Sequence, residues 1–571
     1  MSGIAKEVPE SAPVPVLQAL PDSFSSNPPT PFYLSLLNFP PPSFAHPYAL
    51  LVYTIAACVA PFLCARMVHT AKLQWALRGV PGPPAMPFVG TLILLTKGNW
   101  ELYRLLRFAN KIYGSMFQLW IGSRPVVFLF RAEVVKPLLS SPEHIDKSIE
   151  YNFLQPWLGR GLVTSTGEKW HARRKLLTNT MHKSVLEVFL SMMIQESDLL
   201  IKRLDEQIQE TKAEERGPDG WSKTFDIVPL SKLTALDTTC KTIMGINIHE
   251  QSESEYMTYL EAINRLTSVL HQRFLTPWLR PDILFNLSAL GRDHDKCIRI
   301  TRSFADKVIR ERKEERELQK KMSAMNGDGD EDGPKVARRK ALLDLLLEMS
   351  ENGESLSDQD IREEVDTFMF AGHDTISACF SWTLYLLGHH PEIQDRVVQE
   401  VESELGDKLD GNDITLGDLG NLNFLGSCIK ETMRLFPPVP LMGRDLKTPL
   451  KINGHTLRPG TAVVVATYIL HRDPKVFPEP EKFDPDRFLG PEAEHRSPFA
   501  YTPFSAGSRN CIGQKFAMME VKLWLAKVLR LFEFRSLDKR RELRLQGEIV
   551  LNNINGVRLS TRRRNLNNNL S

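Results

Sequence analysis

The clearest pattern in the chain is an uninterrupted apolar run near its N-terminal end. Residues 48–65 (YALLVYTIAACVAPFLCA) contain no charged side chain. As an α-helix this stretch rises about 27 Å, close to the roughly 30 Å thickness of a bilayer core. A buried core helix is the alternative, but the run is apolar on every side and stands apart from the other helical segments. We predict a single transmembrane anchor over residues 48–65.

The segments on either side of the anchor differ in composition. Residues 1–47 hold 11 of the 38 prolines and only four charged residues, which predicts a disordered, proline-rich tail. Residues 66–84 form a linker that is basic at its start and ends in PGPP, which cannot be helical. Basic residues favour the cytosolic side of a membrane, so we expect the rest of the chain to be cytosolic. A cleaved signal peptide is the weaker alternative, because the apolar run lies far from the N-terminus.

Residues 85–559 have the pattern of one large, mostly helical domain. The longest helical segment is expected over residues 358–389, with Ser357 as its N-cap. A second long helix is expected over residues 514–532, where apolar positions recur with helical spacing. Residues 560–571 predict a polar C-terminal tail.

Composition narrows the class of protein. The 571 residues include 71 Lys or Arg and 69 Asp or Glu, and a net charge of +2 gives no electrostatic reason to expect nucleic acid as a partner. With 42% hydrophobic and 25% charged residues, the chain is neither disordered nor a collagen-like repeat nor a polytopic membrane protein. Its cysteines are scattered, without the spacing of zinc or redox sites, which indicates a reducing compartment.

One cysteine has a distinctive setting. Cys511 directly precedes the helix expected over residues 514–532, so free backbone N–H groups and the helix dipole are expected to favour its thiolate, the form that binds metals. Gly507 and Gly513 on either side leave room for a tight turn and for the close approach of a flat cofactor. A buried helix-cap cysteine is the alternative.

The loop around this cysteine resembles that of a known family. Residues 504–513 (FSAGSRNCIG) are similar to the haem-binding loop of the cytochromes P450, F-x-x-G-x-R-x-C-x-G, at all five fixed positions. The resemblance implies a mainly α fold with small β-sheets (α+β) and a haem b cofactor. It also implies that Cys511 is the axial ligand of the haem iron, that Arg509 pairs with a haem propionate and that Phe504 shields the sulfur.

A second motif of the same family involves an ion pair. Glu431 and Arg434 lie one helical turn apart, which in isolation suggests only a surface pair. In the family this pair is buried and joined by an arginine from a later loop, here Arg487. The resemblance therefore implies a structural network behind the haem.

A third motif lies on an earlier helix. Trp170 and Arg174 have the spacing of the family's W-x-x-x-R helix, so the resemblance implies that both clamp a haem propionate. An ordinary amphipathic helix with basic surface residues would show the same pattern. Arg444, which follows the segment PPVPLMG, is a further candidate for propionate binding.

The longest predicted helix carries the fourth motif. Residues 371–375 (AGHDT) are similar to the family's oxygen-activating sequence [AG]-G-x-[DE]-T, which implies that Ala371 and Gly372 face the haem. The resemblance further implies that Thr375 donates a hydrogen bond to bound dioxygen and that Asp374 helps to relay protons. Gly and Thr are poor helix formers, and a kink over the iron would explain them. We expect His373 to be a packing or solvent-facing residue.

The motifs most resemble the fourth family of cytochromes P450, whose members typically hydroxylate the terminal carbon of fatty acids and related lipids. Many of them bind the haem covalently through a glutamate at the position that Ala371 occupies here. Because alanine has no carboxylate, we predict that the haem is not esterified. Without that rigid tether, we expect weaker selectivity for the terminal carbon.

The resemblance implies a haem-thiolate monooxygenase, anchored in the endoplasmic reticulum membrane, that inserts one oxygen atom of O2 into a lipophilic substrate. Fatty acids or related lipids are the expected substrates, and steroids, terpenoids, hormones and foreign compounds are the alternatives. A non-redox isomerase is disfavoured because Asp374 and Thr375 are present. A non-enzymatic haem-binding protein is more remote still.

The electron donor is expected to be another protein, because the chain has neither a dinucleotide-binding fingerprint nor ferredoxin cysteine spacing. The resemblance implies NADPH–cytochrome P450 reductase, with cytochrome b5 as a second donor. We expect the docking surface to be a basic patch formed by Arg173, Lys175 and Lys183.

Overall fold

The structure is a computed structural model that describes residues 47–86, 90–91, 102–211, 220–247, 253–325, 341–352, 356–411 and 413–564. The proline-rich tail predicted over residues 1–47 lies outside the described residues except for Pro47. The chain divides into two compact units, Met1–Ala65 and Arg66–Ser571.

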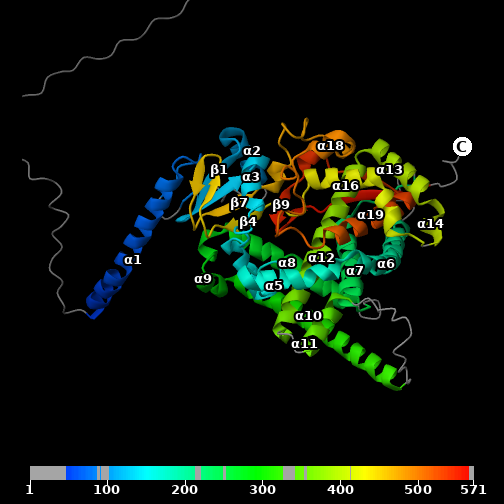
Figure 1. Ribbon diagram of the computed structural model, residues 1–571, viewed down its shortest axis with the longest axis horizontal. Coiled ribbons are helices and arrows are strands. Elements are labelled where there is room, and N and C mark those ends of the chain that lie inside the picture. The colour runs from blue at the N-terminus through cyan, green and yellow to red at the C-terminus, as the bar shows by residue number, and fades with distance from the viewer. Residues whose placement is uncertain are drawn as a thin grey trace, which may run out of the picture. The chain divides into compact units, whose positions relative to one another are not determined.

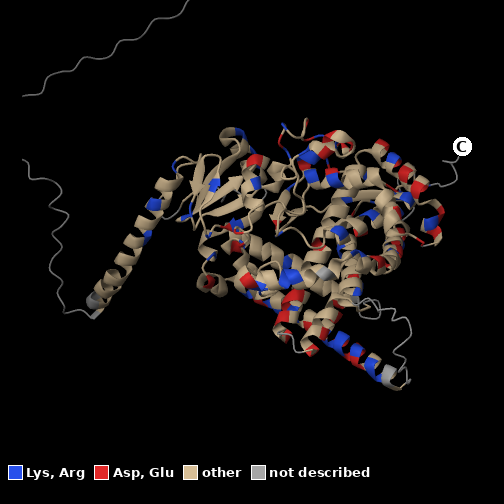
Figure 2. Ribbon diagram, viewed as in Figure 1, with Lys and Arg blue, Asp and Glu red and all other residues tan. Residues whose placement is uncertain are grey.

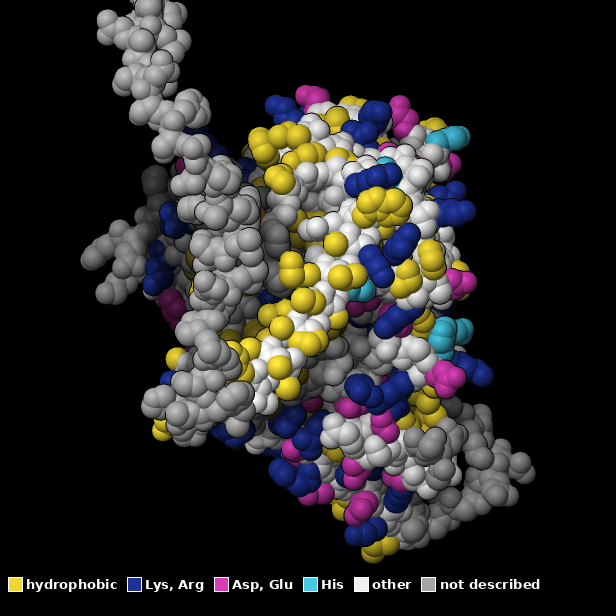
Figure 3. Space-filling view, turned by 90° about the vertical axis from the view of Figure 1, so that its left-hand side faces the viewer, with side chains coloured by type: hydrophobic (Ala, Val, Ile, Leu, Met, Phe, Trp, Pro, Cys, Tyr) yellow, Lys and Arg dark blue, Asp and Glu magenta, His cyan; other side chains and the backbone are white. Residues whose placement is uncertain are grey.

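Helix α1 (Pro47–Leu77) contains the predicted anchor and continues beyond it. Its part Leu51–Leu77 contains an 18-residue stretch with a mean hydropathy of 1.9 and is long enough to cross a membrane. Hydrophobic side chains follow the helix, and basic ones appear only toward its C-terminal end (Figure 3). The expected linker over residues 66–84 is therefore helical at its start, since residues 66–77 contain neither Gly nor Pro.

The unit Arg66–Ser571 is mainly helical with several small sheets, which confirms the predicted fold class (Figure 1). Its longer helices are α2 (Leu102–Tyr113), α5 (Gly167–Thr178), α6 (Lys183–Gln209), α7 (Ile227–Thr239), α8 (Glu253–Leu275), α10 (Ala289–Met325), α11 (Leu342–Glu351), α12 (Asp358–Leu387), α13 (Pro391–Glu404), α16 (Asn423–Leu435) and α19 (Gln514–Leu531). Its shorter helices are α3 (Ala132–Leu139), α4 (Gln155–Leu158), α9 (Asp282–Leu287), α14 (Gly406–Gly411), α15 (Leu416–Asn421), α17 (Thr467–Leu470) and α18 (Pro491–His495).

The largest sheet among the described residues has four strands in the order β1-β2-β7-β4. Strands β2 and β7 are parallel, with Val127 opposite Val463, and the other two pairs are antiparallel. The bounds of these strands are β1 (Met116–Ile121), β2 (Arg124–Leu129), β4 (Met442–Asp445) and β7 (Ala462–Val465). Two hairpins are β5 (Leu450–Ile452) with β6 (His455–Leu457) and β9 (Leu545–Glu548) with β10 (Val550–Asn553).

A three-stranded sheet corrects the predicted C-terminal boundary. It has the order β3-β11-β8, formed by β3 (Phe225–Asp226), β11 (Arg558–Arg563) and β8 (Phe532–Ser536). Because β11 runs to Arg563, the polar tail predicted from residue 560 is wrong for residues 560–563. Thr561 is buried in the sheet, and Arg563 Nε lies 2.7 Å from an Asp205 carboxylate oxygen. From sequence alone, the arginines at the end of β11 indicate a solvated tail. In the structure they pair with residues that are distant in sequence.

Helix α12 is the central element of this unit and packs against α7, α16 and α19. Ser357 caps its start, and its backbone N–H donates to Asp360 at 3.1 Å, as the capping pattern predicts. Over residues 363–387, all side chains are buried except those of Ala371, Gly372 and Thr375. Because α12 is buried on nearly every side, its side chains can form a site only where the neighbouring elements leave a cavity.

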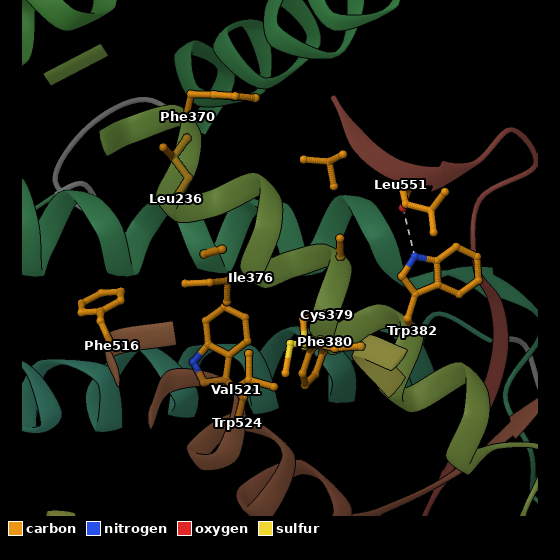
Figure 4. Close-up of a cluster of buried hydrophobic side chains, with 14 of the residues drawn as sticks. Leu236, Phe370, Ile376, Cys379, Phe380, Trp382, Phe516, Val521, Trp524 and Leu551 are labelled. Atoms are coloured by element: carbon orange, nitrogen blue, oxygen red, sulfur yellow. Dashed lines mark hydrogen bonds between the residues drawn. The ribbon is translucent and has the colours of Figure 1, made fainter. Parts of the chain in front are cut away.

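An apolar cluster holds α12 between α7 and α19 (Figure 4). Leu236 of α7 contributes to it, and the rings of Phe380 and Trp524 meet edge to face with 5.4 Å between their centroids. The indole N–H of Trp382 donates to the Leu551 carbonyl at 3.0 Å, which fixes strand β10 against α12. This packing fixes the position of residues 371–375 of α12 between α7 and α19.

The predicted ion-pair network joins α16 to residues 471–487. Arg434 Nε and Nη2 lie 2.6 and 2.8 Å from the two carboxylate oxygens of Glu431, and both side chains are fully buried. Arg487 Nε lies 3.5 Å from the same carboxylate. The remaining N–H groups of Arg434 donate to carbonyls of the later segment, those of His471, Pro480 and Lys482.

Removing the Glu431 carboxylate is expected to destabilise the domain strongly. Glu431→Ala leaves the Arg434 guanidinium buried without a counter-charge, which costs about 3–5 kcal/mol. The control variant Arg541→Ala breaks an exposed contact of 3.9 Å with Glu542 and changes stability by less than about 1 kcal/mol. Thermal unfolding followed by circular dichroism measures both effects, and equal melting temperatures for the two variants would contradict the structural role of the network.

Candidate haem and oxygen site

A cavity of about 300 Å³ lies between α12 and the loop that precedes α19. Ala371, Gly372 and Thr375, the unburied residues in the middle of α12, all line it. From the loop, Phe504, Arg509, Cys511 and Gly513 contribute, as the sequence predicted. The two motifs that lie about 140 residues apart in sequence therefore share one space.

Packing against a neighbouring helix explains why one of the two glycines in the loop must be glycine. Gly507 has a φ of +73°, and a Cβ there would lie 1.9 Å from the Leu139 carbonyl oxygen, so glycine is required by the approach of α3 rather than by a cofactor. Gly513 has an ordinary φ of −87° and lines the cavity. No atom lies within 4 Å of the position that a Cβ would take there, so the space beside Cys511 is open.

The thiol of Cys511 is accessible and lines the cavity, and its backbone N–H donates to the Phe504 carbonyl at 2.9 Å. Burial raises the pKa of Cys511, and this effect outweighs the Gly513 N–H and the charge of Arg174, which both lower it. The N–H group at the helix N-terminus thus favours the thiolate as expected, but burial has the larger effect on the free side chain. A metal that binds here must displace the proton.

Arg509 is held by the chain on one side and lacks a partner on the other. Its guanidinium lies 4.7 Å from the centre of the Trp170 ring and donates to the Ser165 and Val163 carbonyls at 2.6 and 3.1 Å. Its buried Nη1 has no hydrogen-bond partner among the described residues. Burial, reinforced by the charge of Arg444, lowers the pKa of Arg509 to about 9, and the smaller effects of Tyr151 and Asp146 oppose this shift.

Helix α5 supplies Trp170 and Arg174, which both line the cavity. Trp170 contacts Arg509, while Arg174 donates from both terminal nitrogens to Asn510, at 2.7 Å each. Arg174 thereby ties α5 to the residue next to Cys511. Arg173, one residue of the docking patch expected for the electron donor, is buried and forms ion pairs with Asp360 and Glu364 on α12. It therefore does not belong to an exposed docking patch.

Sequence reasoning missed a further cation at the cavity, Lys147. Its ammonium lies 4.5 Å from the centre of the Tyr151 ring, and both residues line the space. Burial and the charges of Arg444 and Arg509 hold the pKa of Lys147 well below its usual range. No motif surrounds Lys147; only a β-bridge to Arg444 brings it here. Arg444 is buried but does not itself line the cavity.

These cations provide the test of whether the site fits haem. Among the described residues, no carboxylate forms an ion pair with Lys147, Arg174, Arg444 or Arg509. Buried positive charge without counter-charge is unfavourable, and two propionates would supply that counter-charge. An accessible thiol, the open space at Gly513 and this cation cluster fit haem b.

On α12, Thr375 faces the cavity and Asp374 does not. The Thr375 hydroxyl donates to the Ala371 carbonyl at 2.9 Å, whereas the Asp374 carboxylate lies 2.6 Å from Lys232 Nζ. A Cβ at Gly372 would lie 2.7 Å from Thr239 Oγ1, so the glycine lets α7 pack closely against an unbroken helix. His373 is buried, with Nδ1 lying 2.6 Å from the Met369 carbonyl oxygen, and is thus a packing residue.

Comparisons with known proteins agree with this site. A family model described as Cytochrome P450 matches residues 80–559. The chain is 40% identical over 518 residues to "Cytochrome P450 4c3" of Drosophila melanogaster, covering 90% of this chain and 94% of the relative. It is 41% identical over 507 residues to "Cytochrome P450 4V2" of Homo sapiens, covering 88% and 93% of the two chains. The chain therefore belongs to the fourth family of the cytochrome P450 superfamily and is a haem-dependent monooxygenase.

Proposed function

We propose that this monooxygenase hydroxylates fatty acids or related lipids at the endoplasmic reticulum membrane, using haem b held by Cys511. The observation that carries the proposal is that Cys511 and Thr375 line the same largely apolar cavity. When bound, haem supplies the activation of O2. The helix α1 supports a membrane location, where lipophilic substrates are concentrated.

The chain's own residues bind the cofactor and shape the substrate site. Arg509 and Lys147 are placed to neutralise the propionates, and the Trp170 ring holds the Arg509 guanidinium. Phe370, Val439, Ile549 and other apolar residues line the cavity. An apolar lining binds an aliphatic chain and excludes water from the reacting position.

Thr375 supplies a hydroxyl on the α12 wall of the cavity. In the structure this hydroxyl donates to the Ala371 carbonyl, and a rotation about χ1 redirects it into the cavity. Asp374, the preceding residue, is the proposed partner of Thr375 in proton relay, and its carboxylate lies in an ion pair with Lys232. A non-redox rearrangement would need neither group.

The haem is held without a covalent bond to the protein in this proposal. Ala371 replaces the glutamate that could form an ester. Among the described residues that line the cavity, none is Asp or Glu, so no other carboxylate is placed to substitute for it.

NADPH–cytochrome P450 reductase is the proposed electron donor, with cytochrome b5 as a second one. Because Arg173 is buried, the proposed docking patch consists of Lys175 and Lys183, which are both exposed. The Arg174–Asn510 contact places α5 next to the cysteine loop, so this patch lies on the cysteine side of the cavity. Figure 2 shows basic residues on and around α5.

The reaction itself is tested with oxygen-18 gas, NADPH, reductase and lauric acid. The product is expected to be hydroxylated lauric acid that carries one oxygen-18 atom. In Thr375→Val, which keeps the shape but loses the hydroxyl, the yield of product per NADPH is expected to fall roughly tenfold or more. Product without oxygen-18, or turnover without NADPH, would contradict monooxygenation.

The state of the haem is tested by acid denaturation and extraction into organic solvent. From the wild type, all haem is expected to leave the protein, because no ester holds it. The variant Ala371→Glu restores the carboxylate, and a fraction of its haem is expected to stay on the chain after turnover. Mass spectrometry of the protein measures both, and haem retained by the wild type would refute the proposal.

The docking patch is tested by charge reversal. Lys175→Glu with Lys183→Glu is expected to raise the KM for reductase several-fold at low salt, with a smaller effect at high salt, where charges are screened. Lys451→Glu, an equally exposed reversal on β5, serves as the control and is expected to change little. An unchanged KM for the double variant at every salt concentration would exclude this patch.

A further inference from the structure

The carboxylate of Glu364 on α12 binds the backbone of the segment that precedes α5. Its Oε2 accepts the Leu162 backbone N–H at 3.0 Å, and the Glu364 side chain is fully buried. Gly161 allows this close approach, because a Cβ there would lie 2.3 Å from Thr367 Oγ1 on the same helix. Segment 161–165 therefore lies directly against α12.

Arg509 binds the same segment through its carbonyl groups. Its Nη2 donates to the Ser165, Val163 and Leu162 carbonyls at 2.6, 3.1 and 3.5 Å. Leu162 thus gives its N–H to a carboxylate and its carbonyl to a guanidinium. Hydrogen bonds to charged groups are stronger than those between neutral groups, so Glu364 and Arg509 together fix this stretch of backbone.

Segment 161–165 also borders the haem cavity. Leu162, Val163 and Arg509 all line it. Because a guanidinium is planar and rigid, the position of Arg509 Nη2 against the segment determines where Nη1 points. Nη1 is buried and has no hydrogen-bond partner among the described residues, so it is the nitrogen of Arg509 that is left for a propionate.

The charge of Glu364 depends on its surroundings. The charged residues around it are Arg173 and Lys169 of α5 and Glu363 and Asp360 of its own helix. Segment 161–165 itself carries no charged side chain. Burial raises the pKa of Glu364 to about 7, against the opposing effects of the Leu162 N–H and of Arg173. The carboxylate therefore changes its charge near neutral pH.

We propose that Glu364 is a positioning residue for Arg509 and that it acts through segment 161–165 to strengthen haem binding. The ionised carboxylate fixes the Leu162 N–H, the fixed segment orients the Arg509 guanidinium, and the guanidinium binds a propionate. A neutral side chain at position 364 loosens the first of these contacts, so the protein releases haem more readily. The inference rests on the haem site of the proposed function and is independent of the substrate.

The first experiment measures how fast the ferric, haem-loaded full chain transfers its haem to an excess of apomyoglobin. Glu364→Met keeps a side chain of similar size but has no acceptor oxygen. At pH 8 its rate of haem loss is expected to rise about tenfold, because the Leu162 N–H is left buried without a partner. The matched control Glu363→Gln changes the adjacent carboxylate, which binds Lys169, and is expected to stay within about twofold of the wild type. Equal rates for Glu364→Met and the wild type overturn the proposal.

The role of the charge is tested with Glu364→Gln, which keeps an acceptor oxygen but is neutral at every pH. The wild-type rate of haem loss is expected to rise about threefold as the pH falls from 8 to 6, because protonation weakens the hydrogen bond to Leu162. Glu364→Gln is expected to lose haem at nearly the wild-type rate of pH 6 and to lack this rise. A rise of equal size in both proteins contradicts the role of the Glu364 charge.

The route through Arg509 is tested by a double-mutant cycle. Arg509→Lys keeps the positive charge but lacks the planar fork that binds the segment and a propionate together, so it is expected to speed haem loss. Adding Glu364→Met to Arg509→Lys is expected to have little further effect, because both substitutions act on one contact. If the two effects on the rate multiply instead, Glu364 does not act through Arg509.

The reduction potential of the haem separates positioning of Arg509 from general loosening of the fold. In Glu364→Met the potential is expected to shift to a lower value, because a displaced cation stabilises the reduced iron less. Faster haem loss with an unchanged potential would contradict the proposal. None of these measurements needs a substrate, so a wild type that holds haem but leaves lauric acid unchanged refutes the proposed substrate alone.

Discussion

Buried positive charge beside a single accessible thiol is the constraint on which the rest of this structure depends. Lys147, Arg444 and Arg509 lie close enough to lower one another's affinity for protons, and no described carboxylate pairs with them. Such a cluster is unfavourable by itself. An anionic group in the cavity would stabilise it, so we expect stability and cofactor binding to be coupled.

The same constraint explains why distant segments meet at the cavity. Arg509 fixes the backbone of residues 163–165, Arg174 ties α5 to Asn510, and the β-bridge between Lys147 and Arg444 adds the edge of the sheet. Behind them, the Glu431–Arg434 pair holds the segment that leads toward the cysteine loop. Each of these contacts holds a segment of backbone in place. Together they fix the position of Cys511 before any cofactor is present.

Helix α12 carries several buried acidic residues. Burial raises the pKa of Asp366 to about 8 and that of Glu364 to about 7, while Asp374 is held in a close ion pair by Lys232. A helix so rich in acids, with Gly372 and Thr375 at its middle, is poor by local propensity. The surroundings explain these residues. On α7, Thr239 packs against Gly372 and Lys232 pairs with Asp374, while Thr375 lines the cavity.

Much of this site could be predicted from sequence, because motifs of fixed spacing determine local geometry. The start of α12 at Ser357, the helix after Cys511 and the pairing of Glu431 with Arg434 all follow from residues close together in the chain. The contact of Trp170 with Arg509, the place of Lys147 and the burial of Arg173 depend on packing between segments far apart. No local pattern carries that information.

The most direct test of this account is X-ray absorption at the iron K-edge of the haem-loaded ferric protein. We expect one sulfur among the atoms bound to iron, and we expect it to be missing in Cys511→Ser while the variant keeps its fold. A ligand shell of nitrogen and oxygen alone in the wild type, or a sulfur that persists in Cys511→Ser, would contradict the central claim that this thiol holds the haem iron.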